Sequence, residues 1–292
     1  MTFHGAARAI LHWLAAWLVF RPPWTRAPPR ANAGTAVYVP ANAECAVIYF
    51  HGTGGLATIP PWLRAAFGPR AAVIAPEYPG YGTLADVRPD EAGVLAAADA
   101  AYERALALGV PPARIYVWGR SLGGAPAAYL AATRPCGGLV MHAAFASVFT
   151  VVAPWAGRLA RAWDVDMFDN AAHLVDVACP IAFVHATDDR LLPLADHCTP
   201  NLRAVRHTPK RLWRVGGGHG APPPQAVVDE VAKWITSFYS YASVTPPAPG
   251  RMTVSDSRPY ASHERKLSSA YTRAIARAAA STTVCSGPAR SV

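Results

Sequence analysis

Short apolar runs recur through the middle of the chain and alternate with longer stretches of helical period. A strand that is buried on both faces is apolar throughout, which is typical of a parallel sheet covered by helices on both sides. The pattern therefore predicts an α/β fold with a mostly parallel sheet and helices on both faces. The predicted strands are residues 46–50, 71–75, 115–118, 138–142, 181–185 and 212–215.

Two long helices are predicted between and after these strands. Residues 91–108 form the first and end before Gly109, which is followed shortly by two prolines. Residues 224–239 form the second, in which Val227, Val231 and Trp234 recur at helical spacing. With 292 residues, of which 52% are hydrophobic, the chain is long enough to bury one large core.

A serine lies at the junction between the strand at 115–118 and the small-residue stretch that follows it. Ser121 is the central residue of a G-x-S-x-G sequence that starts at Gly119 and ends at Gly123. Between a strand and a helix, the two glycines let the backbone turn sharply and leave the serine hydroxyl exposed, as in a nucleophile elbow. We therefore predict that Ser121 is a nucleophile. The pentapeptide also occurs by chance, so this prediction depends on partners elsewhere in the chain.

A nucleophilic serine on this kind of sheet needs an acid and then a histidine, in that chain order. Two aspartates lie in the loop after the strand at 181–185. Asp189 is the predicted acid and Asp188 is the alternative. A structural role, in which the two aspartates only cap the following turn, is the other interpretation.

The predicted general base is His219, which lies in the glycine loop 216–220 after the strand at 212–215. An imidazole can take the serine proton and return it to the leaving group. Other histidines lie in or at the ends of apolar runs, where a hydrogen-bonded structural role is expected, or in less defined segments. These are His51, His142 and His185 for the first group, and His197 and His207 for the second.

Two backbone N–H groups are expected to bind the oxyanion that forms during acyl transfer. The residue after the nucleophile, Leu122, supplies one of them. We assign the second to Thr53, because the glycines of loop 51–55 can turn N–H groups inward after the strand at 46–50. An ordinary glycine turn is the alternative interpretation of this loop.

Five motifs follow one another along the chain: HGTGG at 51–55, EYPGYG at 77–82, GRSLGG at 119–124, DRLLP at 189–193 and GGGHG at 216–220. With these motifs in this order, the chain resembles an α/β-hydrolase-fold serine hydrolase, and in particular the ABHD branch of acyl-lipid and acyl-protein hydrolases, over residues 35–240. Glu77 stands where that branch usually has aspartate, and Gly220 stands where asparagine is common.

The resemblance and the residues together predict an α/β-hydrolase fold with a small or absent lid, because few residues separate the strands at 138–142 and 181–185. The predicted reaction is cleavage of an ester or thioester, in an acyl lipid or an S-acyl protein, through an acyl-enzyme. Neither a metal nor a cofactor is implied. A serine peptidase and a non-catalytic interaction protein are the alternatives. Five aromatic residues are either acyl-site or core residues: Trp62, Phe145, Phe149, Trp155 and Trp163.

Charge divides the chain into three parts. Residues 40–240 carry as many basic as acidic residues, so the net charge of +9 belongs to the two ends. Residues 1–34 include an apolar run at 9–20, which is too short to span a bilayer and fits an interfacial anchor, a signal-anchor or a helix packed on the body. Residues 241–292 are rich in Ser, Ala and Arg and are predicted to be mostly disordered.

Basic ends on a neutral body indicate attachment to an anionic membrane surface, with solvated tails as the alternative. Nucleic acid is not expected as a partner, because the body has no basic-aromatic patches. Five cysteines show no close spacing in the sequence and no metal-ligand pattern, which indicates a reducing compartment. We therefore expect a membrane-associated protein on the cytoplasmic side, and otherwise a cytoplasmic one.

Overall fold

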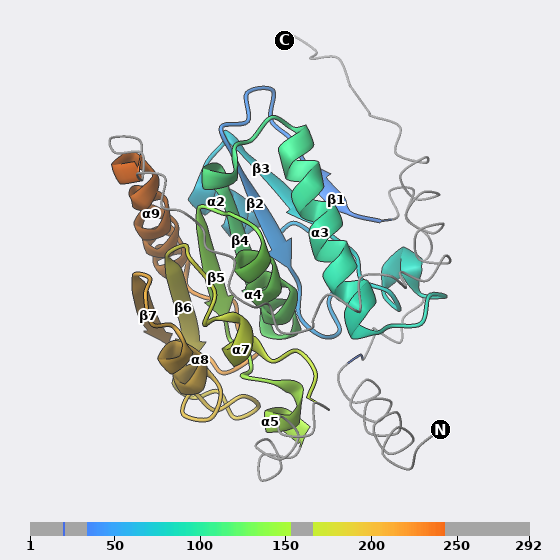
Figure 1. Cartoon of the computed structure of the whole chain (residues 1–292), viewed down its shortest axis with the longest axis vertical. Helices are drawn as coiled ribbons and strands as arrows, with labels where there is room; N and C mark the ends of the chain where they lie inside the picture. Colours follow the sequence, from blue (N-terminus) through green and yellow to red (C-terminus); the bar gives the residue numbers. More distant parts are fainter. Residues whose placement is uncertain (1–19, 21–33, 153–165, 243–292) are drawn as a thin grey trace, which may run out of the picture.

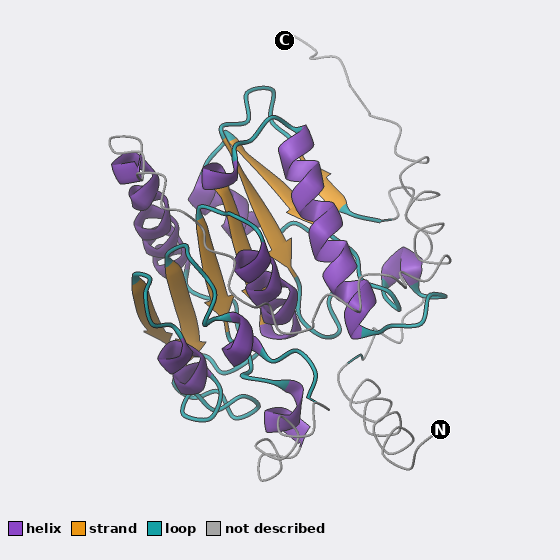
Figure 2. Cartoon of the chain, viewed as in Figure 1, coloured by secondary structure: helices purple, strands orange, loops and turns teal. Residues whose placement is uncertain are grey.

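The computed structural model describes Phe20, residues 34–152 and residues 166–242, and these residues place helices on both faces of a central sheet (Figures 1 and 2). The sheet has seven strands in the order β1-β3-β2-β4-β5-β6-β7. Strand β1 runs antiparallel to β3, and all other pairs are parallel. The strands are β1 (Ala36–Tyr38), β2 (Cys45–Phe50), β3 (Ala71–Ala75), β4 (Ile115–Arg120), β5 (Gly138–His142), β6 (Ile181–Ala186) and β7 (Lys210–Val215).

The helices divide between the two faces of this sheet, as Figure 1 shows for α3 and α4 in front and α2 and α9 behind. Short α7 and α8 lie on the side of α4. The α-helices of the described residues are α2 (Pro61–Phe67), α3 (Glu91–Ala107), α4 (Gly124–Thr133), α5 (Val148–Val152), α7 (Asn170–His173), α8 (Cys198–Ala204) and α9 (Gln225–Ala242).

Burial on both faces explains why the strands are apolar throughout. In β2, Ile48 and Phe50 pack into the core under α3 and α4, while Val47 and Tyr49 pack into the core under α2 and α9. Neighbouring side chains on a strand point to opposite faces, so a strand covered on both sides needs apolar residues at every position. The predicted fold class is confirmed.

The boundaries of the elements differ from the predicted ones by a few residues. Strand β4 continues to Arg120, two residues beyond the predicted end, so Ser121 directly follows the strand. Strand β1 was not predicted from the sequence, because it has three residues, each only partly buried. An edge strand of this kind lacks the continuous apolar signal of the central strands.

Two cysteines that are far apart in the sequence lie together in the fold. The Sγ atoms of Cys136 and Cys179 are 3.3 Å apart, in the segments that precede β5 and β6. Both thiols are free. The sequence spacing does not indicate this contact, which arises because the parallel pairing of β5 with β6 brings the two segments side by side.

Several predicted segments fall outside the described residues. These are most of the N-terminal segment 1–34, most of the tail 241–292, and residues 153–165 of the expected small lid, with Trp155 and Trp163. Phe20, at the end of the apolar run 9–20, is buried and meets the ring of Phe168 edge to face at 5.9 Å. Among the described helices, none combines the length and apolar character needed to cross a bilayer.

Candidate active site

The turn that carries Ser121 has a backbone conformation that few residues adopt. Ser121 has a φ of 52°, in the left-handed region, and is the first residue of the 3₁₀ turn that joins the end of β4 to α4. A Cβ atom on Gly119 would lie 2.6 Å from the Cβ of Ala127, and one on Gly123 would lie 2.5 Å from the carbonyl carbon of Phe50. The two glycines of the motif therefore allow the strand and the helix to approach each other closely. This is the geometry expected of a nucleophile elbow.

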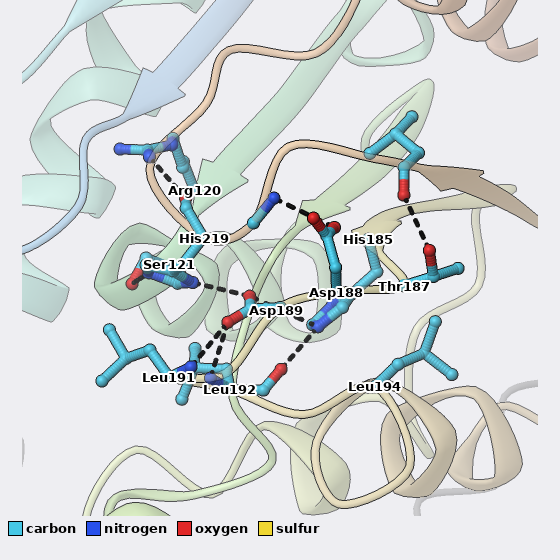
Figure 3. A network of polar contacts seen from close by, with 12 residues as sticks. Arg120, Ser121, His185, Thr187, Asp188, Asp189, Leu191, Leu192, Leu194 and His219 are labelled. Carbon is cyan, nitrogen blue, oxygen red and sulfur yellow. Dashed lines mark hydrogen bonds and ion pairs between the residues drawn. The ribbon is translucent and has the colours of Figure 1, made fainter.

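Figure 3 shows that Ser121, His219 and Asp189 form one hydrogen-bonded chain. The Oγ atom of Ser121 lies 3.0 Å from Nε2 of His219. On the other side of the ring, Nδ1 of His219 lies 2.8 Å from Oδ2 of Asp189. Because a carboxylate only accepts, Nδ1 carries the proton and Nε2 presents its lone pair to the serine hydroxyl.

The carboxylate of Asp189 is buried and fully supplied with donors. Its Oδ1 atom accepts hydrogen bonds from the backbone N–H groups of Leu191 and Leu192, at 3.0 and 2.8 Å. Its Oδ2 atom faces His219 and lies 3.7 Å from Nε2 of His185. A buried carboxylate is tolerated when each oxygen has such partners. The main chain thus holds one oxygen and leaves the other for the imidazole.

Asp188, the alternative acid, points to a different part of the same loop. Its exposed carboxylate accepts hydrogen bonds from the N–H groups of Gly217 and Gly218, at 3.2 and 3.0 Å. These contacts, chiefly the one from Gly218, lower the pKa of Asp188. Of the two aspartates, Asp189 is the one that contacts His219, while Asp188 holds the glycines that precede it.

The loop after β2 passes directly beside the serine. A Cβ atom on Gly52 would lie 3.2 Å from the Cβ of Ser121, so the absence of a side chain permits this approach. Thr53, the next residue, is exposed, and Leu122 is buried at the start of the 3₁₀ turn. Of the two residues predicted to bind the oxyanion, Leu122 directly follows Ser121, and Thr53 directly follows Gly52, which lies beside Ser121.

A buried contact between a histidine and a glutamate lies beside this loop and was not predicted from the sequence. His51 stacks on Tyr78 at 4.2 Å, and its Nε2 atom lies 3.3 Å from Oε1 of Glu77. The Tyr78 hydroxyl donates a hydrogen bond of 3.1 Å to the carbonyl oxygen of His51, and Glu77 accepts one from the N–H of Ala57. Glu77 thus contacts both His51 and Ala57 in the chain that follows β2, which gives a structural reason for a carboxylate at the first position of EYPGYG.

Comparison with known proteins was made by sequence and by structure. No protein-family model matches the chain. The "Alpha/beta hydrolase domain-containing protein aho-3" of Caenorhabditis elegans is 29% identical over 148 residues, which cover 50% of the chain and 43% of that relative. An uncharacterized protein of Mycobacterium tuberculosis is 31% identical over 200 residues, which cover 65% of the chain and 69% of that relative.

The chain belongs to the α/β-hydrolase family. A solved structure described as a puromycin-hydrolyzing peptidase of Mycobacterium tuberculosis matches this α/β-hydrolase with a TM-score of 0.56 and 18% identity, over 71% of this chain and 36% of that one. At this identity the match shows the fold. The sequence match to the nematode protein spans less than half of that protein's length.

Of the five other histidines considered from the sequence, four are buried in this α/β-hydrolase and His207 is exposed. His51, His142, His185 and His197 are buried, and Nε2 of His185 lies 2.8 Å from the carbonyl oxygen of Leu192. Burial, followed by the positive charge of Arg120, lowers the pKa of His142 to about 3. His142 is therefore neutral at physiological pH. Among the described residues, no group of three or more His, Cys, Asp and Glu side chains could hold a metal ion.

The three described aromatic residues among those considered for an acyl site lie on both faces of the sheet. Phe145 and Phe149 are buried in the core on the side of α3 and α4. Trp62 belongs to the opposite side, where it packs against Tyr49 and Trp118. Core packing is thus the role that the structure shows for Trp62.

Proposed function

We propose that this α/β-hydrolase is a serine hydrolase that cleaves carboxylic esters or thioesters through an acyl-enzyme. The observation that carries the proposal is the hydrogen-bonded chain from Ser121 through His219 to the buried Asp189, on a partly exposed elbow with a positive φ. A structural serine does not require a left-handed backbone, a histidine on its hydroxyl and an orienting carboxylate together.

Acylation starts when the Ser121 hydroxyl attacks the substrate carbonyl carbon. The C–O bond to the substrate forms as the hydroxyl proton passes to Nε2 of His219, and the carbonyl oxygen becomes an oxyanion. Asp189 stabilises the imidazolium through its contact with Nδ1. When the tetrahedral intermediate collapses, His219 returns the proton to the departing alcohol or thiol, and the acyl group stays on Ser121.

Water then releases the acyl group by the same steps. His219 takes a proton from a water molecule as its oxygen attacks the acyl carbon, and it returns the proton to the Ser121 oxygen as the acid leaves. In both halves of the reaction, the backbone N–H groups of Leu122 and Thr53 are proposed to bind the oxyanion. Loss of one such donor typically costs about 10²- to 10³-fold in kcat.

The proposed substrate class is an acyl lipid or an S-acyl protein at an anionic membrane surface on the cytoplasmic side. This rests on the position of the net charge of +9, which belongs to the two ends of the chain, and on the apolar run 9–20. Phe20, the last residue of this run, packs on Phe168, so the end of the run lies against the body of the fold.

Full-length protein is expected to sediment with vesicles that contain phosphatidylserine and to be released as the salt concentration rises. Clustered Lys and Arg contribute about 1 kcal/mol each near an anionic surface, and salt screens that attraction. Vesicles of phosphatidylcholine are the control. Equal binding to both kinds of vesicle would contradict the electrostatic part of the proposal, and binding to neither would contradict membrane attachment.

A fluorophosphonate probe tests the catalytic proposal, because it forms a stable adduct with an activated serine. Wild-type protein should be labelled, and the adduct should map to the peptide that contains Ser121. Ser121→Ala should not be labelled. Ser237→Ala, which removes an exposed hydroxyl on α9, should be labelled like the wild type. A folded wild-type protein that resists the probe would contradict catalysis and favour the interaction protein.

Matched octanoyl ester, thioester and amide substrates separate the ester hydrolase from the peptidase. The peptidase remains the second candidate because of the structural match to a puromycin-hydrolyzing peptidase. Esters and thioesters should be cleaved faster than the amide, since an alcohol or thiol leaves more readily than an amine. Faster cleavage of the amide would favour the peptidase instead.

A further inference from the structure

The loop that carries His219 has little rigidity of its own. Three glycines precede the histidine, and Gly217 and Gly218 have φ values of 104° and 69°. Glycines give up more backbone freedom than other residues when they are ordered. Nevertheless, proton transfer requires that His219 stay within hydrogen-bonding distance of Ser121, and productive sites hold such geometry to about 0.5 Å. Other residues must therefore restrain this loop.

Two side chains of opposite charge hold the main chain on either side of the histidine. Asp188 accepts hydrogen bonds from the N–H groups of Gly217 and Gly218. Arg120 donates from Nη2 to the carbonyl oxygen of His219 at 2.9 Å and to that of Gly220 at 3.3 Å. Each charge thus meets the backbone group that it can bind, with the carboxylate on donors and the guanidinium on acceptors.

The place of Arg120 in the chain connects this contact to the nucleophile. Arg120 is the last residue of β4 and directly precedes Ser121, so its side chain reaches from the elbow across to the histidine loop (Figure 3). Within the described residues, both hydrogen bonds of its side chain go to these two carbonyl oxygens. The main chain of Arg120 is therefore joined to the nucleophile, and its side chain contacts the loop that carries the base.

The guanidinium of Arg120 also has the loop after β2 as a neighbour. A Cβ atom on Gly52 would lie 3.7 Å from Nη1 of Arg120, so the side chain lies beside the loop after β2. Arginine suits the position because its planar guanidinium presents several fixed donors and stays charged. Lysine would bring a charge and movable donors on a flexible stem.

From these contacts we propose that Arg120 is a positioning residue that holds His219 against Ser121 by binding the carbonyl oxygens of His219 and Gly220. The proposal rests on the proposed function, since it matters only if His219 accepts the serine proton. Arg120 acts through the main chain of the histidine loop and has no role in substrate binding. Its removal should therefore lower kcat and leave KM nearly unchanged.

The test compares Arg120→Ala, Arg120→Lys and the wild type in hydrolysis of an octanoyl ester. Arg120→Ala should lower kcat roughly 10- to 100-fold, the size expected for the loss of hydrogen bonds from a charged donor. Methylguanidinium at millimolar concentration should restore part of the lost kcat in Arg120→Ala but not in the wild type. Arg120→Lys should have an intermediate kcat. Arg211→Ala, which removes an exposed arginine on β7, is the matched control and should behave like the wild type.

Three results would overturn the role of Arg120. An unchanged kcat in Arg120→Ala would show that the loop does not need it. A raised KM with unchanged kcat would show a contact with substrate, and a lowered kcat without recovery in methylguanidinium would show a merely structural role. If Arg120→Ala does not fold, Arg120→Lys decides by the same kcat and KM comparison. An inactive, unlabelled wild type would instead refute the proposed function, so the two failures are distinguishable.

Discussion

Asp189→Asn should lower kcat by about 10⁴-fold with little change in fold, the size seen when a triad aspartate becomes asparagine. The new side chain keeps an oxygen that can accept from the N–H groups of Leu191 and Leu192, as Oδ1 does now. At the position of Oδ2 it has an NH₂ group, which cannot accept a hydrogen bond from Nδ1 of His219. The imidazole then favours the tautomer that carries its proton on Nε2, and it can no longer take the proton of Ser121. Steady-state hydrolysis of an octanoyl ester measures this effect.

Asp188→Asn is the matched control, because the two aspartates are neighbours and the chemical change is the same. Asp188 is exposed, and its two oxygens accept one hydrogen bond each, from the N–H groups of Gly217 and Gly218, so asparagine retains an acceptor for one of the two. We expect a loss in kcat of at most about 10-fold from a loosened histidine loop. If the two variants lose kcat equally, or Asp188→Asn loses more, the assignment of Asp189 as the orienting acid is wrong.

Gly123→Ala should lower the free energy of unfolding by about 4 kcal/mol or more, or prevent folding, because overpacking against a rigid backbone is among the most destabilising changes. The new Cβ would overlap the carbonyl oxygen of Phe50 and would lie 2.5 Å from its carbonyl carbon and 2.7 Å from the carbonyl oxygen of His51. All three atoms belong to the backbone of β2 or the residue after it, so no side chain can rotate away. Urea unfolding followed by circular dichroism measures the change.

Gly216→Ala provides the control for this prediction. A Cβ atom on Gly216 meets no atom within 4 Å, and its φ is not in the left-handed region. We expect its free energy of unfolding to stay within about 1 kcal/mol of the wild type. Similar urea midpoints for the two variants would show that strand β2 and the elbow can separate at little cost.

The sequence predicted the central strands, the elbow, Ser121 and His219, because each has a strong local signal. Strands such as β2 are apolar at nearly every position, and the glycines around Ser121 permit a sharp turn. The signal for the acid was weaker, because Asp188 and Asp189 occupy the same loop, so Asp189 was predicted with Asp188 as the alternative. The N–H groups of Leu191 and Leu192 hold the carboxylate of Asp189 in place, and the sequence does not show which aspartate they bind.

Contacts between distant segments were beyond the reach of the sequence. Arg120 meets the carbonyl oxygen of His219 across 99 positions, and nothing in the local pattern of GRSLGG indicates that its side chain turns toward that loop. The pairing of Glu77 with His51 and the approach of Cys136 to Cys179 have the same origin. Each follows from the order of strands in the sheet, which joins segments that the chain separates.

The pairing of β5 with β6 leaves the residues of the hydrogen-bonded chain outside the segment that joins these two strands. Ser121 follows β4, Asp189 follows β6 and His219 follows β7, so three strands of the continuous parallel block β4 to β7 hold all three residues. The chain between β5 and β6 contributes none of them. A change in the length or sequence of that segment therefore need not alter the spacing of the three residues, which makes it the part of the fold where the candidate site should tolerate variation best.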